Sequence, residues 1–264
     1  MSHCFILASS DDRIHLLNQC IDCIKNSRYS DCDFFLYYQG KSRDFDVDFF
    51  SGIVWDDDLR GVFTPRYELM KRFCLRYDYT ILIDDDLFMN QDTSYETAML
   101  FCNMEPMAGA VALTHSKPAV KNEIRCVSGT REYFNICGGL VLPQKSIKII
   151  LEYFVDKEQD YTEDVFWLLL YVKGLDLYKD YHSYATHIAN RKSKNGELTG
   201  FNKMRIEKPH VPMLSEWFES KKECLANGTS RWKLKDVKDI TSAGILERNR
   251  TRRHVKQWFR KMEK

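Results

Sequence analysis

The sequence predicts an α/β fold with a doubly wound, Rossmann-like sheet, because short apolar runs alternate with amphipathic ones over most of its 264 residues. The clearest strand, YTILID at 79–84, is rich in β-favouring residues and ends abruptly in aspartates. After residue 189 clear strands give way to a basic, helical pattern. We therefore expect an α/β domain over residues 1–189 and a basic, mainly helical extension over residues 190–264.

The expected elements alternate in chain order. Apolar or aromatic runs that end in turn residues predict strands, the third of them short, at 4–8, 32–40, 45–55, 79–84, 107–115, 133–146 and 175–188. Helical spacing of apolar residues predicts helices at 13–27, 64–78, 93–104, 146–154 and 161–174. Thr64 and Pro65 suit the start of the second helix, and Thr93 or Ser94 is the expected cap of the third. This alternation favours ligand binding at the carboxyl ends of the strands.

The net charge of +1 conceals two regions of opposite charge. Residues 1–185 carry 19 basic and 29 acidic side chains, whereas residues 186–264 carry 20 basic and 9 acidic ones. The basic region ends in ERNRTRRHVKQWFRKMEK. Such a segment is either a solvated helix face or a contact with a polyanion, for which a nucleotide diphosphate and a nucleic acid are the candidates.

The sequence predicts a cytoplasmic protein, in the host cytoplasm if it is viral. No apolar run approaches the roughly 20 residues that cross a bilayer, so we expect no transmembrane segment. The start MSHCFILASSDDR lacks the basic region of a signal peptide. Nine cysteines, an odd number that fall mostly in apolar stretches, suit a reducing compartment.

Three consecutive aspartates occur twice, and their settings differ. Asp84, Asp85 and Asp86 follow the buried strand directly, so strand alternation predicts that Asp84 and Asp86 point to one side and Asp85 to the other. Two carboxylates on one side can bind Mg²⁺ or Mn²⁺, which keep positions open for phosphate oxygens. The copy at 56–58 follows a shorter run, and we expect it to be a solvated loop with no strand long enough to present it.

Two further motifs suggest chemistry. Glu163 and Asp164 begin an apolar helix, where the helix dipole favours carboxylates and one of them could act as a general base. The alternative is an ordinary acidic first turn. Gly138 and Gly139 interrupt an apolar strand, and they either allow the backbone to approach a ligand closely or form only a bulge.

In this order the motifs FILASSDDRIHLLNQCIDCI, PRYELM, ILIDDDLFM, NICGGLVLP and TEDVFWLLLYVKG resemble the GT-A class of glycosyltransferases, over residues 4–190. The resemblance implies a GT-A fold and a nucleotide-sugar donor such as a UDP-sugar. It implies that Asp84 and Asp86 hold Mn²⁺ or Mg²⁺ and the donor, with Asp85 beside them. It also implies that Arg66 supports the nucleotide and that the residues after the first strand contact it, namely Ser9, Ser10 and Asp12.

The same resemblance assigns the remaining roles. Gly138 and Gly139 would lie under the sugar and the acceptor. In inverting members the catalytic base corresponds to Asp164, with Glu163 beside it. A late histidine often joins the metal ligands, and His187 is the first choice, with His182 and His210 as alternatives.

The implied activity is sugar transfer to an acceptor hydroxyl, with inversion at the sugar. In the basic tail, Arg252, Arg253, Lys256 and Trp258 interleave charge and aromatic surface, which suits a nucleic-acid backbone and an extruded base. The tail is similar to that of phage-type glycosyltransferases that modify hydroxymethylated pyrimidines, so DNA is the expected acceptor. A lipid-linked or cell-envelope glycan is the alternative.

Other classes fit the residues less well. A phosphatase of the haloacid dehalogenase type usually has Thr or Val where this chain has Phe88, and its motif lies nearer the N-terminus. A nucleotidyltransferase or other phosphotransferase with paired carboxylates typically has a glycine-rich phosphate loop, which we do not find. A non-enzymatic nucleotide-binding module would not need Asp84, Asp86 and Asp164 together.

Overall fold

The computed structural model describes residues 1–60, 63–89, 95–114, 124–128, 139–155, 164–183 and 185–187. These ranges contain most of the expected α/β domain. The expected basic extension at 190–264 lies outside them.

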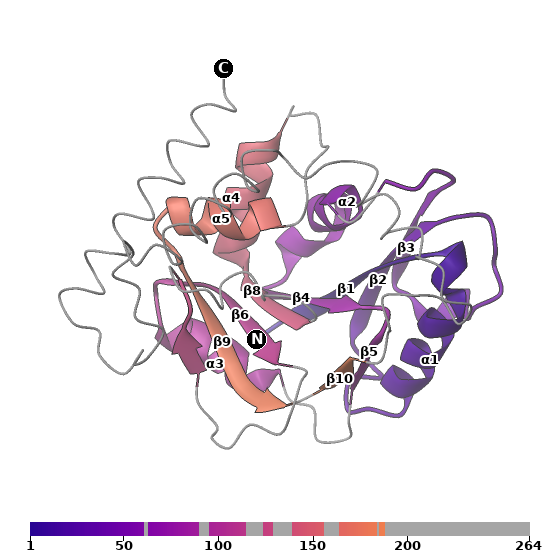
Figure 1. Cartoon of the computed structure of the whole chain (residues 1–264), viewed down its shortest axis with the longest axis horizontal. Coiled ribbons are helices and arrows are strands. Elements are labelled where there is room, and N and C mark those ends of the chain that lie inside the picture. The colour runs from indigo at the N-terminus through magenta and orange to yellow at the C-terminus, as the bar shows by residue number, and fades with distance from the viewer. Residues whose placement is uncertain are drawn as a thin grey trace, which may run out of the picture.

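The core of the molecule is a mixed sheet, in which the described residues form eight strands in the order β3-β2-β1-β4-β8-β6-β9-β7 (Figure 1). Its first four strands are parallel. Strand β8 is antiparallel to both β4 and β6, β9 is parallel to β6, and β7 is antiparallel to β9. The strands are β1 (His3–Ser10), β2 (Asp33–Gln39), β3 (Gly52–Asp56), β4 (Tyr79–Asp84), β6 (Ala108–Thr114), β7 (Ile124–Cys126), β8 (Gly139–Pro143) and β9 (Asp176–Ser183). The predicted mixed α/β sheet is confirmed.

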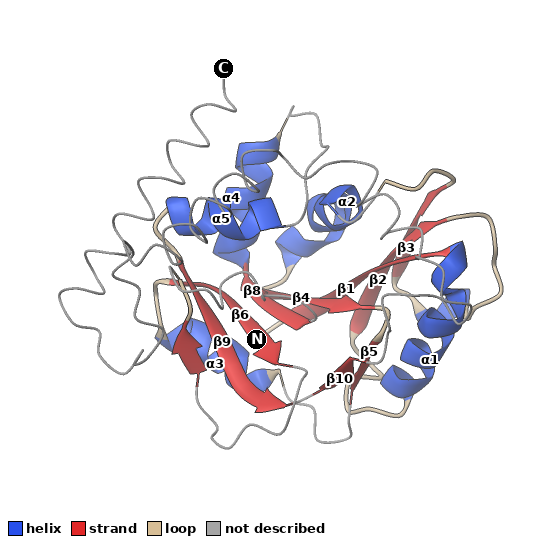
Figure 2. Ribbon diagram, in the orientation of Figure 1, coloured by secondary structure: helices blue, strands red, loops and turns tan. Residues whose placement is uncertain are grey.

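Helices cover both faces of this sheet (Figure 2). Helices α1 (Ile14–Lys25) and α3 (Glu96–Met104) cover one face, and α2 (Phe63–Phe73), α4 (Gln144–Phe154) and α5 (Asp164–Val172) cover the other. Three short 3₁₀ turns complete the described helical elements: η1 (Asp11–Arg13), η2 (Val47–Phe49) and η3 (Cys74–Arg76). A separate pair of short strands, β5 (Leu87–Met89) and β10 (Ala185–His187), runs antiparallel beside α1.

Alternation along the strands divides the core between the two helical layers. In β1, Cys4 and Ile6 pack with α2, α4 and α5, whereas Phe5 and Leu7 pack with α1 and α3. The same alternation continues in β4, where Leu82 faces the α2 side. Because side chains alternate with a period of two, Asp84 at the end of β4 also faces α2.

Four details differ from the sequence-based expectations. Strands β5 and β7 were not expected, since each has only three residues. The N-cap position of helix α3 is Tyr95, which makes no side-chain capping hydrogen bond, whereas the predicted caps Thr93 and Ser94 lie outside the described residues. The short strand expected at 45–55 is observed as β3 at Gly52–Asp56, so it includes Asp56, the first residue of the second aspartate triplet.

Within the described ranges, none of the helices combines the length and the apolar character that a membrane crossing requires.

Candidate functional site

Each of the four parallel strands ends in a polar residue, and these four ends lie at the same edge of the sheet. The register pairs Ser10 with Gln39 and Gln39 with Asp56, and it pairs Ala8 with Asp84. These residues therefore lie in neighbouring positions at the carboxyl ends of their strands. In an open α/β sheet this edge is where ligands bind.

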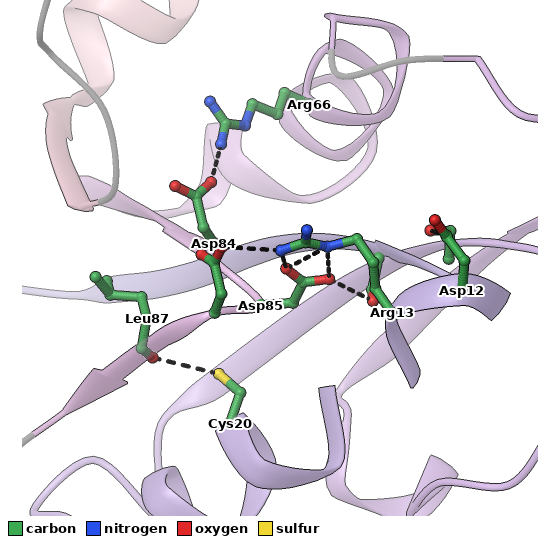
Figure 3. Close-up of polar contacts among 10 residues, drawn as sticks. Asp12, Arg13, Cys20, Arg66, Asp84, Asp85 and Leu87 are labelled. Atoms are coloured by element: carbon green, nitrogen blue, oxygen red, sulfur yellow. Dashed lines mark hydrogen bonds and ion pairs between the residues drawn. The ribbon is translucent and has the colours of Figure 1, made fainter. Parts of the chain in front are cut away.

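Asp84 is paired with an arginine from the neighbouring helix. The Nη2 atom of Arg66, in the first turn of α2, lies 2.5 Å from Oδ1 of Asp84 (Figure 3). The Arg66 side chain is 7% exposed and that of Asp84 is 25% exposed. The Asp84 carboxylate is therefore partly accessible to solvent at the carboxyl end of β4, whereas the Arg66 side chain is buried.

Asp85 is held on the opposite side by residues from β1 and η1. Its carboxylate accepts a hydrogen bond from Ser9 Oγ at 2.7 Å and two from Arg13 Nε at 2.8 Å, and it also contacts Arg13 Nη2 (Figure 3). The same Nη2 lies 3.0 Å from Oδ2 of Asp86. Arg13 thus bridges two neighbouring carboxylates.

The contacts of the three aspartates are not those of one continuous strand. Asp84 pairs with Arg66, whereas Asp85 and Asp86 both contact Nη2 of Arg13. Strand β4 ends at Asp84, and Asp85 and Asp86 form the turn into β5, so strand alternation does not set their orientation. The shared side expected for Asp84 and Asp86 stays a prediction.

Burial and the mutual contact of Arg13 and Asp85 act in opposite directions on both groups. Burial raises the pKa of Asp85 to about 6, although Arg13 and Ser9 act in the opposite direction. Burial by itself lowers the pKa of Arg13, but its contacts with Asp85 and Asp86 outweigh that effect and the pKa is raised. Each partner therefore favours the charged form of the other.

Strand pairing places the backbone of two other predicted residues near Asp84 and Asp86. Gly139 pairs with Ile83, the neighbour of Asp84. His187 in β10 pairs with Leu87, the residue after Asp86. His182 lies instead in β9 of the main sheet.

Asp164 begins α5 at the same end of the molecule. The ring of Phe166, in the first turn of α5, lies 4.5 Å from that of Phe63, the first residue of α2. Arg66 lies in that same turn of α2, so the two helices begin together. Asp164 is therefore on the side of the sheet that presents Asp84.

The predicted nucleotide contacts differ in exposure. Ser9 and Ser10 are buried, and Ser9 supports Asp85. Asp12 is exposed and accepts a hydrogen bond from Ser10 Oγ. The predicted residues that lie outside the described ranges are Glu163, Gly138, His210, Arg252, Arg253, Lys256 and Trp258.

The aspartates at 56–58 serve the local structure of a loop. Oδ2 of Asp56 accepts hydrogen bonds from Tyr37 Oη at 2.6 Å and from Arg60 Nε at 3.2 Å. Arg60 also contacts Asp58, and Asp57 and Asp58 are exposed. The expectation of a solvated acidic loop is confirmed for Asp57 and Asp58, whereas Asp56 is part of the sheet.

The donor set at the end of β4 suits a divalent cation bound jointly with phosphate. Asp84 and Asp86 offer hard carboxylate oxygens, which Mg²⁺ and Mn²⁺ prefer. No cluster of three or more His, Cys, Asp or Glu able to hold a metal occurs within the described ranges. A cation here would have to complete its coordination with ligand oxygens and water, as Mg²⁺ commonly does at phosphate sites.

Arg13 is the residue that sequence reasoning missed. A signal was present, because Arg13 stands at the beginning of α1, where the helix dipole disfavours a cation. A basic residue at such a position indicates a carboxylate partner. The partner could not be identified, since Asp85 lies 72 residues further along the chain.

Comparison with known proteins identifies the fold. No protein-family model matches the sequence. No curated protein sequence matches it either. Among solved structures, TarS 1–349 from S. aureus in complex with UDP-GlcNAc matches with a TM-score of 0.56 at 9% identity, over 77% of this chain and 64% of that one. A second structure of the TarS 1–349 fragment gives a TM-score of 0.54 at 11% identity, over 70% of this chain and 60% of that one.

A third match is a structure of a different glycosyltransferase. The mannosyltransferase PcManGT from Pyrobaculum calidifontis, in complex with GDP-Man and Mn²⁺, gives a TM-score of 0.52 at 12% identity, over 72% of this chain and 58% of that one. This chain therefore spans less than two thirds of each of these three structures. At such identities the likeness concerns the fold, and the fold is that of the GT-A glycosyltransferases.

Proposed function

We propose that this protein is a metal-dependent glycosyltransferase that moves a sugar from a nucleotide-sugar donor to an acceptor hydroxyl. The observation that carries the proposal is the position of Asp84 and Asp86 at the carboxyl end of β4 in a GT-A fold. Gly139, Asp164 and the backbone of His187 lie at the same end. A binding module would not require this set of groups.

Asp84 and Asp86 are the proposed ligands of Mn²⁺ or Mg²⁺, with His187 as a third. When bound, such a cation stabilises the negative charge of a departing nucleoside diphosphate. Arg66, already beside Asp84, is suited to contact the diphosphate. Asp12 and Ser10, after β1, are the proposed contacts for the nucleoside.

Asp164 is the proposed general base, with Glu163 beside it. Its position at the start of α5 favours the ionised carboxylate through the helix dipole. The acceptor oxygen would form a bond to the anomeric carbon as its proton passes to Asp164. The bond between that carbon and the diphosphate oxygen breaks at the opposite face, so the sugar is transferred with inversion.

We propose hydroxymethylated pyrimidine in DNA as the acceptor. The support is the charge of the sequence, since residues 186–264 carry 20 basic against 9 acidic side chains. Arg252, Arg253, Lys256 and Trp258 are the proposed contacts with the nucleic acid. A lipid-linked or cell-envelope glycan is the second candidate.

A thermal-shift screen of nucleotide sugars tests the activity class. Each UDP- and GDP-sugar is added with Mn²⁺ or Mg²⁺ and the melting temperature is measured, because a ligand that binds the native state stabilises it. We expect one donor to raise the melting temperature of the wild type but not of Asp86→Ala. Asp58→Ala, in the exposed acidic loop, is the control and should respond like the wild type. If no nucleotide sugar stabilises the wild type, the protein is not such a transferase.

The acceptor is tested separately with the donor found in that screen. Radiolabelled sugar should be transferred to hydroxymethylated DNA and not to unmodified DNA of the same sequence. Equal transfer to both, or to neither, would exclude the DNA acceptor. Lipid extracts in the same assay would then test the glycan alternative.

A further inference from the structure

We propose that Arg13 is a positioning residue of the donor site, which fixes the turn at Asp85 and Asp86 so that Asp86 meets the cation. This inference rests on the proposed function, and it adds a residue that the resemblance to GT-A enzymes does not assign. Arg13 belongs to η1, between β1 and α1, and is separated from the turn by more than 70 residues of chain. Its role is therefore set by the tertiary fold.

Arg13, Asp85 and Asp86 form a buried cluster of ion pairs, which we call the clamp. Its side chain is 11% exposed, and those of Asp85 and Asp86 are 3% and 7% exposed. Nε donates to both oxygens of Asp85 at 2.8 Å, while Nη2 reaches Oδ1 of Asp85 and lies 3.0 Å from Oδ2 of Asp86. One planar guanidinium thus orients two consecutive residues of the turn.

Two further contacts anchor the same turn. Ser9 Oγ donates to Asp85 at 2.7 Å, which ties the turn to the end of β1. Cys20 Sγ of α1 lies 3.7 Å from the carbonyl oxygen of Leu87 (Figure 3). With its neighbours held on both sides, Asp86 has little freedom to reorient unless Arg13 is removed.

A buried carboxylate makes this clamp necessary. Asp85 lies almost entirely out of water, so loss of its partner would leave an uncompensated charge in the interior. The turn would then have to open to hydrate Asp85, and Asp86 would move with it. Groups that orient a metal ligand in this way commonly affect metal affinity about 10- to 100-fold.

The second acidic loop provides a matched control. Arg60 also contacts two aspartates, Asp56 and Asp58, but its side chain is 52% exposed. Loss of Arg60 leaves carboxylates that water can solvate, and no proposed metal ligand depends on it. Arg60→Gln therefore removes the same kind of side chain from the same edge of the sheet without disturbing the clamp.

The experiment compares the wild type, Arg13→Gln, Arg13→Lys and Arg60→Gln, each at a temperature where circular dichroism shows it to be folded. Mn²⁺ is titrated, alone and with UDP or GDP, and the free ion is measured by electron paramagnetic resonance. We expect Arg13→Gln to weaken Mn²⁺ binding about 10-fold or more. Arg13→Lys should also bind Mn²⁺ more weakly than the wild type. An ammonium group cannot contact both oxygens of Asp85 and Oδ2 of Asp86 at the same time.

Hydrogen exchange at the amides of residues 85–89 gives a readout that needs neither metal nor donor. Arg13→Gln should accelerate exchange there about 10-fold, and Arg60→Gln should leave it unchanged. Mn²⁺ affinity and exchange in Arg13→Gln equal to those of Arg60→Gln would overturn the proposal. If the wild type binds neither Mn²⁺ nor any nucleotide sugar, the proposed function fails, and exchange alone then decides whether Arg13 holds the turn.

Discussion

Arg66 in the first turn of α2 and Asp84 at the end of β4 form an ion pair with 2.5 Å between Nη2 and Oδ1. The arginine is buried, whereas the aspartate is a quarter exposed. The pair therefore joins a helix to the sheet and at the same time keeps a carboxylate at the surface where a donor would bind. Arg13 pairs with the two following aspartates, Asp85 and Asp86, in the turn after β4.

Replacement of Arg66 should affect both stability and donor binding. We expect Arg66→Ala to lower the free energy of unfolding by about 2 kcal/mol, because a largely buried ion pair loses one partner. Urea denaturation measures this loss. Affinity for the donor that stabilises the wild type should also fall about 10-fold, since a cation beside the diphosphate is lost.

Arg72 is the matched control for Arg66, because it lies in the same helix and also forms an ion pair. Its Nε atom lies 3.2 Å from Oε2 of Glu68, but the Arg72 side chain is 55% exposed. Arg72→Ala should cost less than about 0.5 kcal/mol, as exposed ion pairs contribute little. Equal costs for the two variants would show that the Arg66–Asp84 pair does not connect α2 to the sheet.

The loop after β2 offers a test of backbone geometry at the edge of the site. Gly40 has φ +148°, and a Cβ atom there would lie 2.2 Å from the carboxylate of Asp11. Asp11 accepts hydrogen bonds from Tyr38 Oη and from the backbone N–H groups of Lys41 and Ser42. We expect Gly40→Ala to reduce the free energy of unfolding by about 3 kcal/mol, because it combines backbone strain with a clash.

Gly174 separates these two effects. Its φ is +99°, but among the described residues no atom beyond the glycine and its two chain neighbours lies within 4 Å of the position of an added Cβ. Gly174→Ala should therefore cost only the backbone strain, about 1 kcal/mol. Denaturant titration of both variants gives the comparison, and a cost for Gly174→Ala as large as for Gly40→Ala would contradict the contribution of Asp11.

The sequence was sufficient to predict the elements with strong local patterns. The strand at 79–84 is predicted with its observed bounds, because the five residues YTILI favour β-structure and the run then changes sharply to aspartate. Strand β5 escaped prediction, since three residues are too few to show a period. The contacts of Arg13 with Asp85 and Asp86 depend on a turn and join distant segments of the chain, and neither feature leaves a periodic signal in the sequence.

His187 provides a prediction about the metal. Its backbone pairs with Leu87, next to Asp86, so His187→Ala should weaken Mn²⁺ binding about 10-fold if the side chain is a ligand. The measurement is a Mn²⁺ titration in the presence of UDP or GDP. His182→Ala is the control, because His182 lies in β9 of the main sheet. A larger effect in His182→Ala would reverse the assignment of the two histidines.

Asp56 should reveal its structural role through pH. Burial raises the pKa of Asp56, but hydrogen bonds from Tyr37 and from the N–H of Asp58, with the contact to Arg60, outweigh burial and leave the pKa below its usual 3.8. A carboxyl group whose pKa is lowered on folding stabilises the native state above its unfolded pKa, and this contribution is lost as the pH falls through the folded pKa. At pH 7, Asp56→Asn should therefore be less stable than the wild type by about 1 kcal/mol.

Below pH 4 the difference between wild type and Asp56→Asn should shrink, because the wild-type carboxyl group becomes protonated there. Urea denaturation at pH 7, 5, 4 and 3 measures the trend. Donor-induced stabilisation should be intact in Asp56→Asn and lost in Asp86→Ala, since only the turn after β4 is proposed to bind the cation. A difference that grows as the pH falls would mean that Asp56 is not the ionised partner of Tyr37 and Arg60. The structural role of Asp56 in the sheet edge would then have to be assigned to its neutral form.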